Sequence, residues 1–314
     1  MIEVFYYDKS LKTGSLKDIS NLRNIKVWVD ITNITKEDAA AIKDMFELHS
    51  LTVEDMINSN TRIKVEEFPN YLFMVIYGIE KKGKNIGLVE IDLTIGDNFI
   101  ISNHKANISS IELLKKNKDK IENLFKKGND FILHKIIDDE IDNYFPILET
   151  IDNEIENIEE KVSAKPDQKI LKDILSLKRQ IITIKKAALP QREKISFLAK
   201  NDYRYISKKS VPYFRDIYDH AIRVADAIDN YREAAGNTFD VYMSSVSNSM
   251  NEVMKVLSIF ATIALPLSVI SGIYGTNFTT LPGANFAYGF WGMIIGMLIV
   301  CIGMLYFFRK RRWF

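Results

Sequence analysis

The longest regular pattern in the chain, residues 211–272, is helical. In its charged first part only Gly236 opposes a helix, and Pro212 falls where a first-turn proline is tolerated, because its missing N–H needs no partner there. At about 1.5 Å per residue such a helix would be roughly 90 Å long. Residues 256–274 carry no charge and are long enough to cross a bilayer. The pattern predicts one helix that runs from water into a membrane.

A second apolar run, residues 286–308, is also long enough to cross a bilayer once. Four basic residues follow it at 309–312, and Lys255 stands just before the first span. Residues 275–285, between the two spans, carry no charge. The positive-inside rule therefore predicts that both termini are cytoplasmic and that the loop between the spans lies outside.

The first 130 residues alternate between short helical and β-rich runs and predict a soluble α/β domain. Gly83 and Gly87 are expected in turns. The expected strands cover residues 27–31, 63–66, 71–77, 88–95 and 98–102, and the expected helices cover 35–42, 50–57 and 108–127. This region has no glycine-rich phosphate loop and no Ser/His/Asp or Cys/His set, so we expect no enzyme.

Apolar residues spaced alternately by four and three predict a pair of packed helices in the next segment. The first series runs from Ile137 to Val162, residues 165–167 break it, and the second runs from Ile170 to Gln191. A short turn between two long helices favours antiparallel packing. The first helix is rich in Asp and Glu and the second in Lys and Arg, so we expect these two helices to pair by charge. For any single carboxylate of the acidic run, the simpler interpretation is a solvated side chain.

The composition of the whole chain excludes only a few classes of protein. The chain has 42 Lys and Arg against 41 Asp and Glu, so its net charge says little about partners, and we expect no nucleic-acid partner. The single cysteine, Cys301, excludes an intrachain disulfide, and the four histidines show no metal-ligand spacing. The first residues lack the features of a signal peptide.

Small and polar residues form one stripe along the first span. The stripe consists of Asn251, Met254, Ser258, Ala261, Leu265, Ser268 and Gly272. Such a stripe suits either a water-filled path or ordinary packing against other helices, and the pattern alone does not separate the two.

The residues that follow the first span, Tyr274-Gly275-Thr276-Asn277-Phe278, resemble the Tyr-Gly-Met-Asn-Phe signature of the CorA family of divalent-cation transporters. The segments 211–220, 243–248 and 251–257 and the basic-aromatic tail are also similar to that family. The resemblance implies an α+β fold assembled as a homopentameric funnel in the cell (inner) membrane, with both termini cytoplasmic. The domains would be a cytoplasmic α/β domain (1–130), an antiparallel helical hairpin (131–210), the cytoplasmic part of a long stalk helix (211–255), a pore-lining transmembrane helix (256–274), an outer loop (275–285), a second transmembrane helix (286–308) and a basic cytoplasmic tail (309–314).

The resemblance also implies roles for individual residues. Gly275, Thr276 and Asn277 would form the selectivity filter, where a ring of Asn277 side chains binds hydrated Mg²⁺. Residues that would line the pore are Asn251, Met254, Leu257, Ser258, Ala261, Leu265, Ser268 and Gly272. Mg²⁺ would be both transported and regulatory, and the regulatory ion would bind between subunits at Glu54, Asp55, Asp138 and Asp216.

Two departures from the family pattern leave the preferred metal open. Thr276 replaces the usual methionine, and residues 279–284 carry none of the acidic residues that are common in the outer loop. A transporter for Zn²⁺, Co²⁺ or Ni²⁺ is one alternative, although the pore stripe lacks the His and Cys ligands that softer metals prefer. A membrane-anchored coiled-coil scaffold or sensor without transport is an alternative of another class.

Overall fold

The computed structural model describes residues 1–19, 25–83, 85–164, 167–200, 202–277, 281–283, 286–311 and 313. They form two compact units. One unit comprises Met1–Lys161 and Asp167–Phe239, and the other comprises Val162–Pro166 and Asp240–Phe314. The long helix α8 (Val211–Tyr274) contributes to both units, as the sequence pattern predicted.

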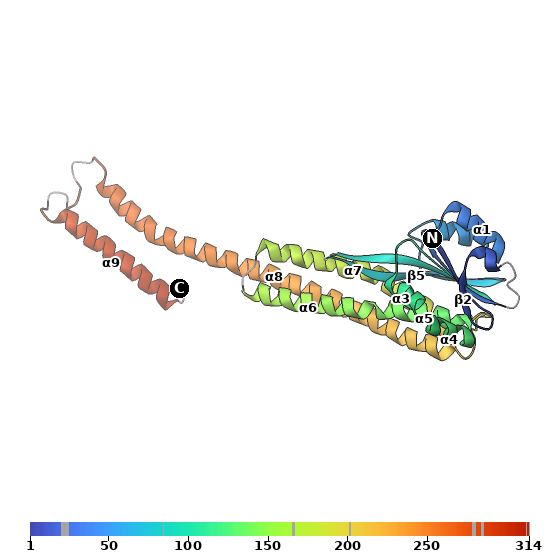
Figure 1. The fold of residues 1–314 in the computed structure, drawn as a ribbon. Coiled ribbons are helices and arrows are strands. Elements are labelled where there is room, and N and C mark those ends of the chain that lie inside the picture. The colour runs from blue at the N-terminus through green and yellow to red at the C-terminus, as the bar shows by residue number, and fades with distance from the viewer. Residues whose placement is uncertain are drawn as a thin grey trace. The chain divides into compact units, whose positions relative to one another are not determined.

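A mixed seven-stranded sheet is the centre of the first unit (Figure 1). Its strand order is β2-β1-β3-β7-β6-β5-β4, in which β3 and β7 are parallel and all other neighbours are antiparallel. The strands are β1 (Ile2–Tyr7), β2 (Leu11–Gly14), β3 (Lys26–Thr32), β4 (Lys64–Phe68), β5 (Tyr71–Lys82), β6 (Asn85–Gly96) and β7 (Phe99–His104). The five strands predicted from the sequence are confirmed, whereas β1 and β2 were not predicted.

Helices cover both faces of this sheet. Alternating residues such as Val29, Val75 and Ile101 point to the face that packs against α1 (Lys36–Phe46) and α2 (Ser50–Ile57). Helices α5 (Asn129–Asp142) and α7 (Gln168–Lys200) contact strands β5 and β6 of the sheet. A layered α+β core of this kind explains why β3 and β5 are nearly continuous apolar runs.

Two local predictions in the sheet domain were wrong. The helix expected over 108–127 is divided into α3 (Ser109–Lys116) and α4 (Lys118–Lys127), because the side chain of Asn117 accepts a hydrogen bond from the Lys120 N–H at 3.0 Å and starts a new helix. Gly87 does not lie in a turn but in strand β6, opposite Glu80. Gly83 does occupy the turn, with a positive φ of 63°.

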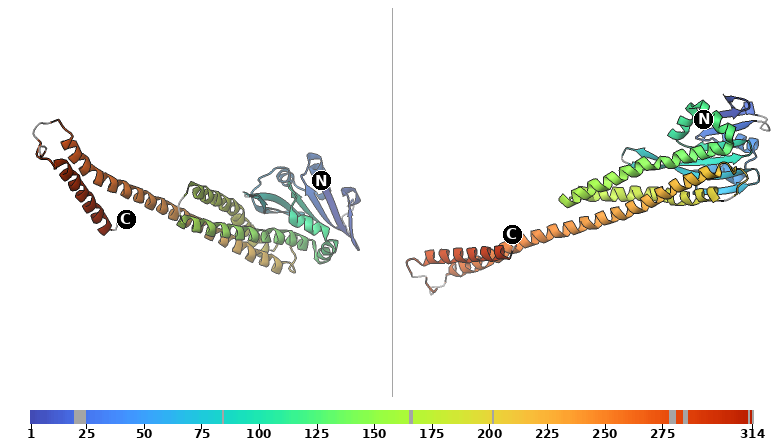
Figure 2. Two further views of the ribbon diagram at one scale, coloured as in Figure 1. Left: turned by 60° about the vertical axis from the view of Figure 1, so that its left-hand side comes forward. Right: turned by 90° about the horizontal axis from the view of Figure 1, so that it is seen from below.

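A helical bundle completes the first unit. Helix α6 (Tyr144–Ala164), helix α7 and the first part of α8 run alongside one another in the views of Figures 1 and 2. The predicted heptad residues are buried, among them Ile151, Ile155, Ile174 and Ile181. Residues 165 and 166 of the predicted helix break lie outside the described residues.

Two charges of the basic helix have a different partner from the one predicted. Lys185 and Arg192 of α7 pair with Asp229 and Asp226 of α8, at 2.5 and 3.9 Å between nitrogen and oxygen, rather than with the acidic helix α6. Both pairs are partly exposed, so each contributes little stability. The sequence pattern revealed two helices of the bundle but not that α8 is the third member, which faces the basic residues.

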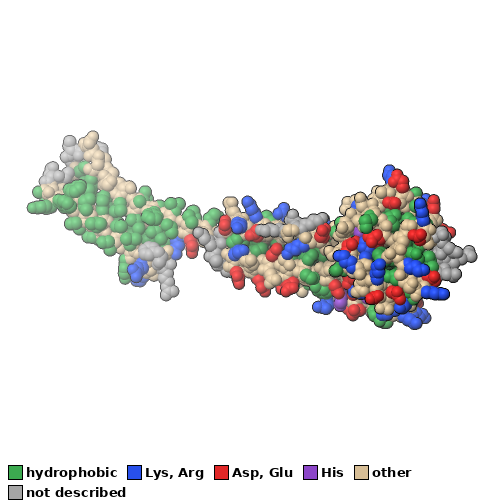
Figure 3. Space-filling model, in the orientation of Figure 1, with side chains coloured by type: hydrophobic (Ala, Val, Ile, Leu, Met, Phe, Trp, Pro, Cys, Tyr) green, Lys and Arg blue, Asp and Glu red, His purple; other side chains and the backbone are tan. Residues whose placement is uncertain are grey.

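The second unit is a hairpin of two apolar helices. The end of α8 and α9 (Gly289–Lys310) lie side by side in both views of Figure 2, and both are long and apolar enough to cross a membrane. Their side chains are hardly buried within the chain, and hydrophobic side chains cover their surface in Figure 3. Phe260 and Leu265 are each 69% exposed and belong to a continuous apolar surface of the kind that marks a protein or membrane interaction site. The two helices therefore suit a lipid or protein environment.

Candidate functional site

The predicted filter residues follow directly after the last turn of α8. The Gly275 N–H donates to the Ser271 carbonyl at 2.9 Å, which continues the helical hydrogen-bond pattern by one residue. A Cβ on residue 275 would lie 3.0 Å from that same carbonyl oxygen, so the position favours glycine through its lack of a side chain rather than through a positive φ. Asn277 is exposed. Phe278 of the signature and residues 279, 280, 284 and 285 of the loop lie outside the described residues.

Thr276 supports the end of the helix. Its hydroxyl donates to the Ile273 carbonyl at 2.8 Å, and its N–H donates to the same oxygen at 3.3 Å. The Tyr274 hydroxyl donates to the Pro282 carbonyl at 3.1 Å and ties the helix end to the loop. The threonine therefore adds a side-chain hydrogen bond to a carbonyl at the helix end, which a methionine at this position cannot do.

The predicted stripe falls on one continuous helix. Because α8 is unbroken from Val211 to Tyr274, residues spaced by three and four lie along one side of it. All eight residues predicted to line the pore are exposed in the single chain: Asn251, Met254, Leu257, Ser258, Ala261, Leu265, Ser268 and Gly272. Ser258 also lines, with Thr262, a cavity of about 460 Å³ against Gly303 and Phe307 of α9. At Ser258 the stripe therefore borders the neighbouring helix of the same chain.

The four predicted regulatory carboxylates lie on three elements. Glu54 and Asp55 are on α2, where Glu54 is exposed and Asp55 binds the Lys64 ammonium at 2.6 Å. Asp138 is on α5 and Asp216 is exposed on α8. Among the described residues that can ligate a metal, neither Glu54 nor Asp55 belongs to a group of three with ligand atoms within 4.8 Å of one another. Within the described part of a single chain, the two α2 carboxylates therefore lack the neighbouring ligands that a metal site would need.

Asp138 and Asp216 lie near a common histidine. Burial lowers the pKa of His134, while the carboxylates of Asp138 and Asp216 act in the opposite direction. Asp138 also binds the Lys135 ammonium at 3.0 Å. Helices α5 and α8 thus bring two of the predicted carboxylates to one part of the molecule.

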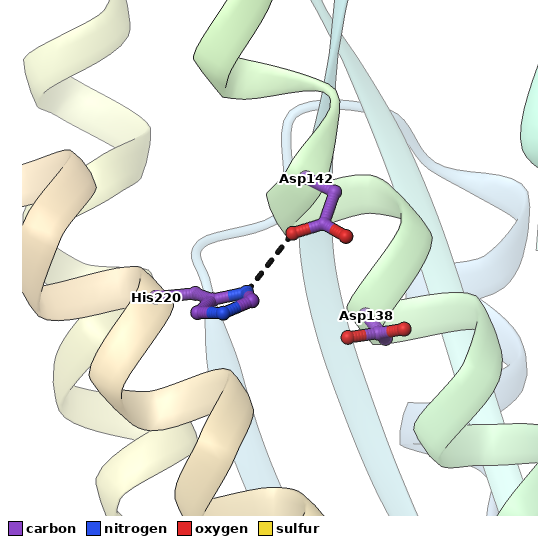
Figure 4. A group of neighbouring side chains, drawn as sticks. All are labelled: Asp138, Asp142 and His220. Carbon is purple, nitrogen blue, oxygen red and sulfur yellow. Dashed lines mark hydrogen bonds and ion pairs between the residues drawn. The ribbon is translucent and has the colours of Figure 1, made fainter.

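Two further residues that the sequence did not single out join this group. His220 of α8 contacts Asp142 of α5 through its Nδ1, at 2.9 Å from the carboxylate oxygen (Figure 4). Ligand atoms of Asp138, Asp142 and His220 all lie within 4.8 Å of one another. Two carboxylates and an imidazole are a suitable donor set for a divalent cation. The i, i+4 spacings of Asp138 with Asp142 and of Asp216 with His220 are the signal that was available in the sequence.

A charged α+β domain is followed by two exposed apolar helices, each long and apolar enough to cross a membrane. Residues 24–310 match the family described as CorA-like Mg²⁺ transporter protein. The cobalt/magnesium transport protein CorA of Thermotoga maritima is 34% identical, over 99% of this chain and 92% of the relative. The chain belongs to the CorA family, whose members are ion transporters and not enzymes. The resemblance inferred from the signature is thereby confirmed.

The fold comparison agrees with this assignment. The complete structure of the CorA magnesium transporter from Methanocaldococcus jannaschii superposes with a TM-score of 0.88, covers 100% of this chain and 99% of its own, and is 22% identical. A more distant relative, the zinc transport protein ZntB of Yersinia enterocolitica, is 20% identical over 91% of this chain and 87% of its own. The predicted fold class, an α/β domain with a long helix and two terminal apolar helices, is confirmed.

Proposed function

We propose that this chain conducts divalent cations, above all Mg²⁺ and also Co²⁺ and Ni²⁺, across the cell membrane through a pore lined by α8 helices of five copies. The observation that carries the proposal is the Gly275-Thr276-Asn277 turn at the end of an uncharged, exposed α8 in a member of the CorA family. Mg²⁺ loses its water shell reluctantly and keeps several waters. A ring of Asn277 carboxamides would bind that shell firmly enough to select the ion and weakly enough to release it.

The proposed pathway needs no chemical energy source. A divalent ion that crosses 100 mV gains about twice ~2.3 kcal/mol. Asn251 would form an inner polar ring, and Met254, Leu257 and Leu265 would form apolar collars that close the path by dewetting. Both termini would be cytoplasmic, since the described basic residues Arg309, Lys310 and Arg311 follow the second span.

Flux into proteoliposomes tests this function. The full chain is reconstituted, a potential is imposed, and uptake of Mg²⁺, Co²⁺, Ni²⁺ and Zn²⁺ is measured in parallel. Potential-dependent uptake with Mg²⁺ preferred supports the proposal. Preference for Zn²⁺ would favour the second candidate, a zinc transporter, which rests on the similarity to ZntB and on the changed signature residue Thr276. Absence of any uptake would reject transport.

Replacing Thr276 by methionine tests how much the signature variant matters. The substitution removes the hydroxyl that donates to Ile273, a hydrogen bond of the kind that contributes about 0.5–1.5 kcal/mol. We expect transport to persist and the relative preference for Mg²⁺, Co²⁺ and Zn²⁺ to shift by less than about tenfold, the factor that corresponds to such an energy. A complete change of preferred metal in the parallel flux assay would give Thr276 a direct part in selection.

We further propose that cytoplasmic Mg²⁺ bound between subunits holds the pore closed. Glu54 and Asp55 of one subunit would face Asp138 and Asp216 of its neighbour. Among the described residues, no group of three metal-ligating side chains joins the α2 carboxylates to Asp138 or Asp216 within one chain. The contact of Asp142 with His220 adds two ligands beside Asp138. Carboxylates that meet across an interface repel one another unless a cation lies between them.

Lys64 is the competitor of the regulatory ion in this proposal. Its ammonium binds Asp55 at 2.6 Å and Glu66 at 2.9 Å, and its side chain is only 14% exposed. The change Lys64→Met keeps an apolar side chain of similar length, removes the ammonium that lies 5.4 Å from the Phe73 ring centroid, and frees the Asp55 carboxylate. We expect half-maximal inhibition at a several-fold lower internal Mg²⁺ concentration. Lys64→Arg, which keeps the charge, is the control, and an unchanged inhibition curve in Lys64→Met would contradict the competition.

A further inference from the structure

A group of polar side chains interrupts the apolar face of the sheet that packs against α1 and α2. Glu90 and Asp92 are two residues apart on β6 and therefore point to the same face. Asn103 of β7 is directly opposite Asp92, and Tyr77 of β5 is directly opposite Glu90. The neighbouring residues of this face, such as Val75, belong to the apolar core. Carboxylates at these positions are costly to bury and require a compensating partner.

One oxygen of each carboxylate has such partners. The Asp92 Oδ2 accepts from the Asn103 amide at 2.8 Å, and that amide also donates to the Met56 carbonyl at 2.9 Å. The Glu90 Oε2 accepts from the Tyr77 hydroxyl at 3.0 Å and from the backbone N–H groups of residues 60 and 61, at 2.5 and 3.0 Å. These contacts fix the orientation of all three side chains.

The second oxygen of each carboxylate and the amide oxygen of Asn103 lack such hydrogen-bond partners in the described part of the chain. Glu90 Oε1, Asp92 Oδ1 and Asn103 Oδ1 are buried and have no hydrogen-bond partner within the described part of the chain. Asp92 and Asn103 are each only 3% exposed. All three residues line a cavity of about 210 Å³ beside the C-terminal end of α2. Buried acceptors without partners are rare in folded proteins, because each costs about 1–3 kcal/mol.

Protonation does not resolve this arrangement. Burial raises the pKa of Asp92 to about 8; the hydrogen bond from Asn103 opposes this rise, and the negative charges of Glu90 and Asp55 add to it. A protonated Asp92 gains one donor, whereas three acceptors are unpaired, so protonation alone leaves at least two of them without a partner. Lys105, also at the cavity, is exposed and acts on the Asp92 carboxyl only through its charge.

A hydrated cation satisfies all three acceptors together. Its coordinated waters donate hydrogen bonds, and its charge offsets that of two carboxylates at close range. The unpaired atoms are oxygens only, which suit hard cations such as Mg²⁺ and Ca²⁺, and the cavity leaves room for the several waters that Mg²⁺ retains.

We propose that the cavity bounded by Glu90, Asp92 and Asn103 is a binding site for one hydrated divalent cation. The site lies within a single chain and is separate from the inter-subunit carboxylates proposed above. It is nevertheless adjacent to them in the fold, because Asn103 holds the carbonyl of Met56, the residue after Asp55 on α2. An ion in the cavity would stabilise the end of the helix that carries Glu54 and Asp55.

The test counts bound ions on the full chain in detergent. Equilibrium dialysis with Mg²⁺ is performed on the variant Asp55→Ala/Asp216→Ala, in which the proposed inter-subunit site is disabled. Adding Asp92→Asn to this variant is expected to remove one further Mg²⁺ per chain and to abolish the corresponding Mg²⁺-induced rise in Tm. Asp44→Asn, on the exposed side of α1, is the control that should change neither.

Asparagine at position 92 is expected to fold, because it removes a charge that folding must desolvate and retains the side-chain size. Glu90→Gln serves as a second variant, since a glutamine oxygen still accepts the backbone N–H groups of residues 60 and 61. We expect Glu90→Gln to weaken the binding of the same Mg²⁺ by at least several-fold. An unchanged ion count in the folded Asp92→Asn and Glu90→Gln proteins would overturn the proposal, whether or not the inter-subunit site proves correct.

Discussion

Replacing Asn277 by alanine is expected to reduce divalent-cation flux to the level of empty liposomes while the oligomer remains assembled. In the proposed pore the Asn277 carboxamides are the groups that accept hydrogen bonds from the water shell of the ion, and alanine supplies none. Asn277 is exposed and follows the last helical turn, so its truncation leaves no cavity in a core. The measurement is Mg²⁺ uptake into proteoliposomes under an imposed potential.

Two controls separate loss of the filter from loss of the protein. The oligomer is examined by size-exclusion chromatography with light scattering, which must give the same mass for variant and wild type. Asn237→Ala removes an exposed asparagine from the aqueous part of the same helix and should leave flux unchanged. Normal flux from a correctly assembled Asn277→Ala protein would mean that the ion does not pass through a ring of these side chains.

The sequence was sufficient for the elements whose residues interact mainly with their own neighbours or with lipid. The length of α8 and the apolar character of α9 follow from uninterrupted helical patterns, and the five strands β3 to β7 follow from β-rich runs. Strands β1 and β2 were missed because their stability depends on pairing, of β1 with β3 and of β2 with β1, rather than on their own composition. Likewise, the membership of α8 in the bundle was missed, because the sequence of α8 shares no local pattern with those of α6 and α7.

The candidate sites also show that contacts between residues distant in sequence could not be predicted. The signature Gly275-Thr276-Asn277 is a contiguous motif and was found, as were the carboxylates that resemble the family pattern. The contact between Asp142 and His220 joins residues 78 apart in sequence, and no spacing rule connects them. The cavity at Asp92 is hidden for a further reason, because a carboxylate within a strand looks in the sequence like an ordinary solvent-facing residue.

The change Asp55→Ala/Asp216→Ala is expected to make the current much less sensitive to internal Mg²⁺. In the proposed gate, Mg²⁺ between Asp55 of one subunit and Asp216 of the next stabilises the closed ring, and without metal the same carboxylates repel. Alanine at both positions removes the ligands and the repulsion together. A ligand shifts a conformational equilibrium only through its differential affinity for the two states, so Mg²⁺ loses its effect on closure when that difference disappears.

The measurement is current or flux against internal Mg²⁺ for wild type and double variant, together with the Mg²⁺-induced rise in thermal stability, of which the double variant should lose a large part. Asp219→Ala, an exposed carboxylate three residues further along α8 from Asp216, is the matched control and should keep the wild-type curve. If the double variant also kept that curve, Asp55 and Asp216 would not be ligands of the regulatory ion. Closure of the pore would then depend on other ligands, of which the group of Asp138, Asp142 and His220 is the first to test.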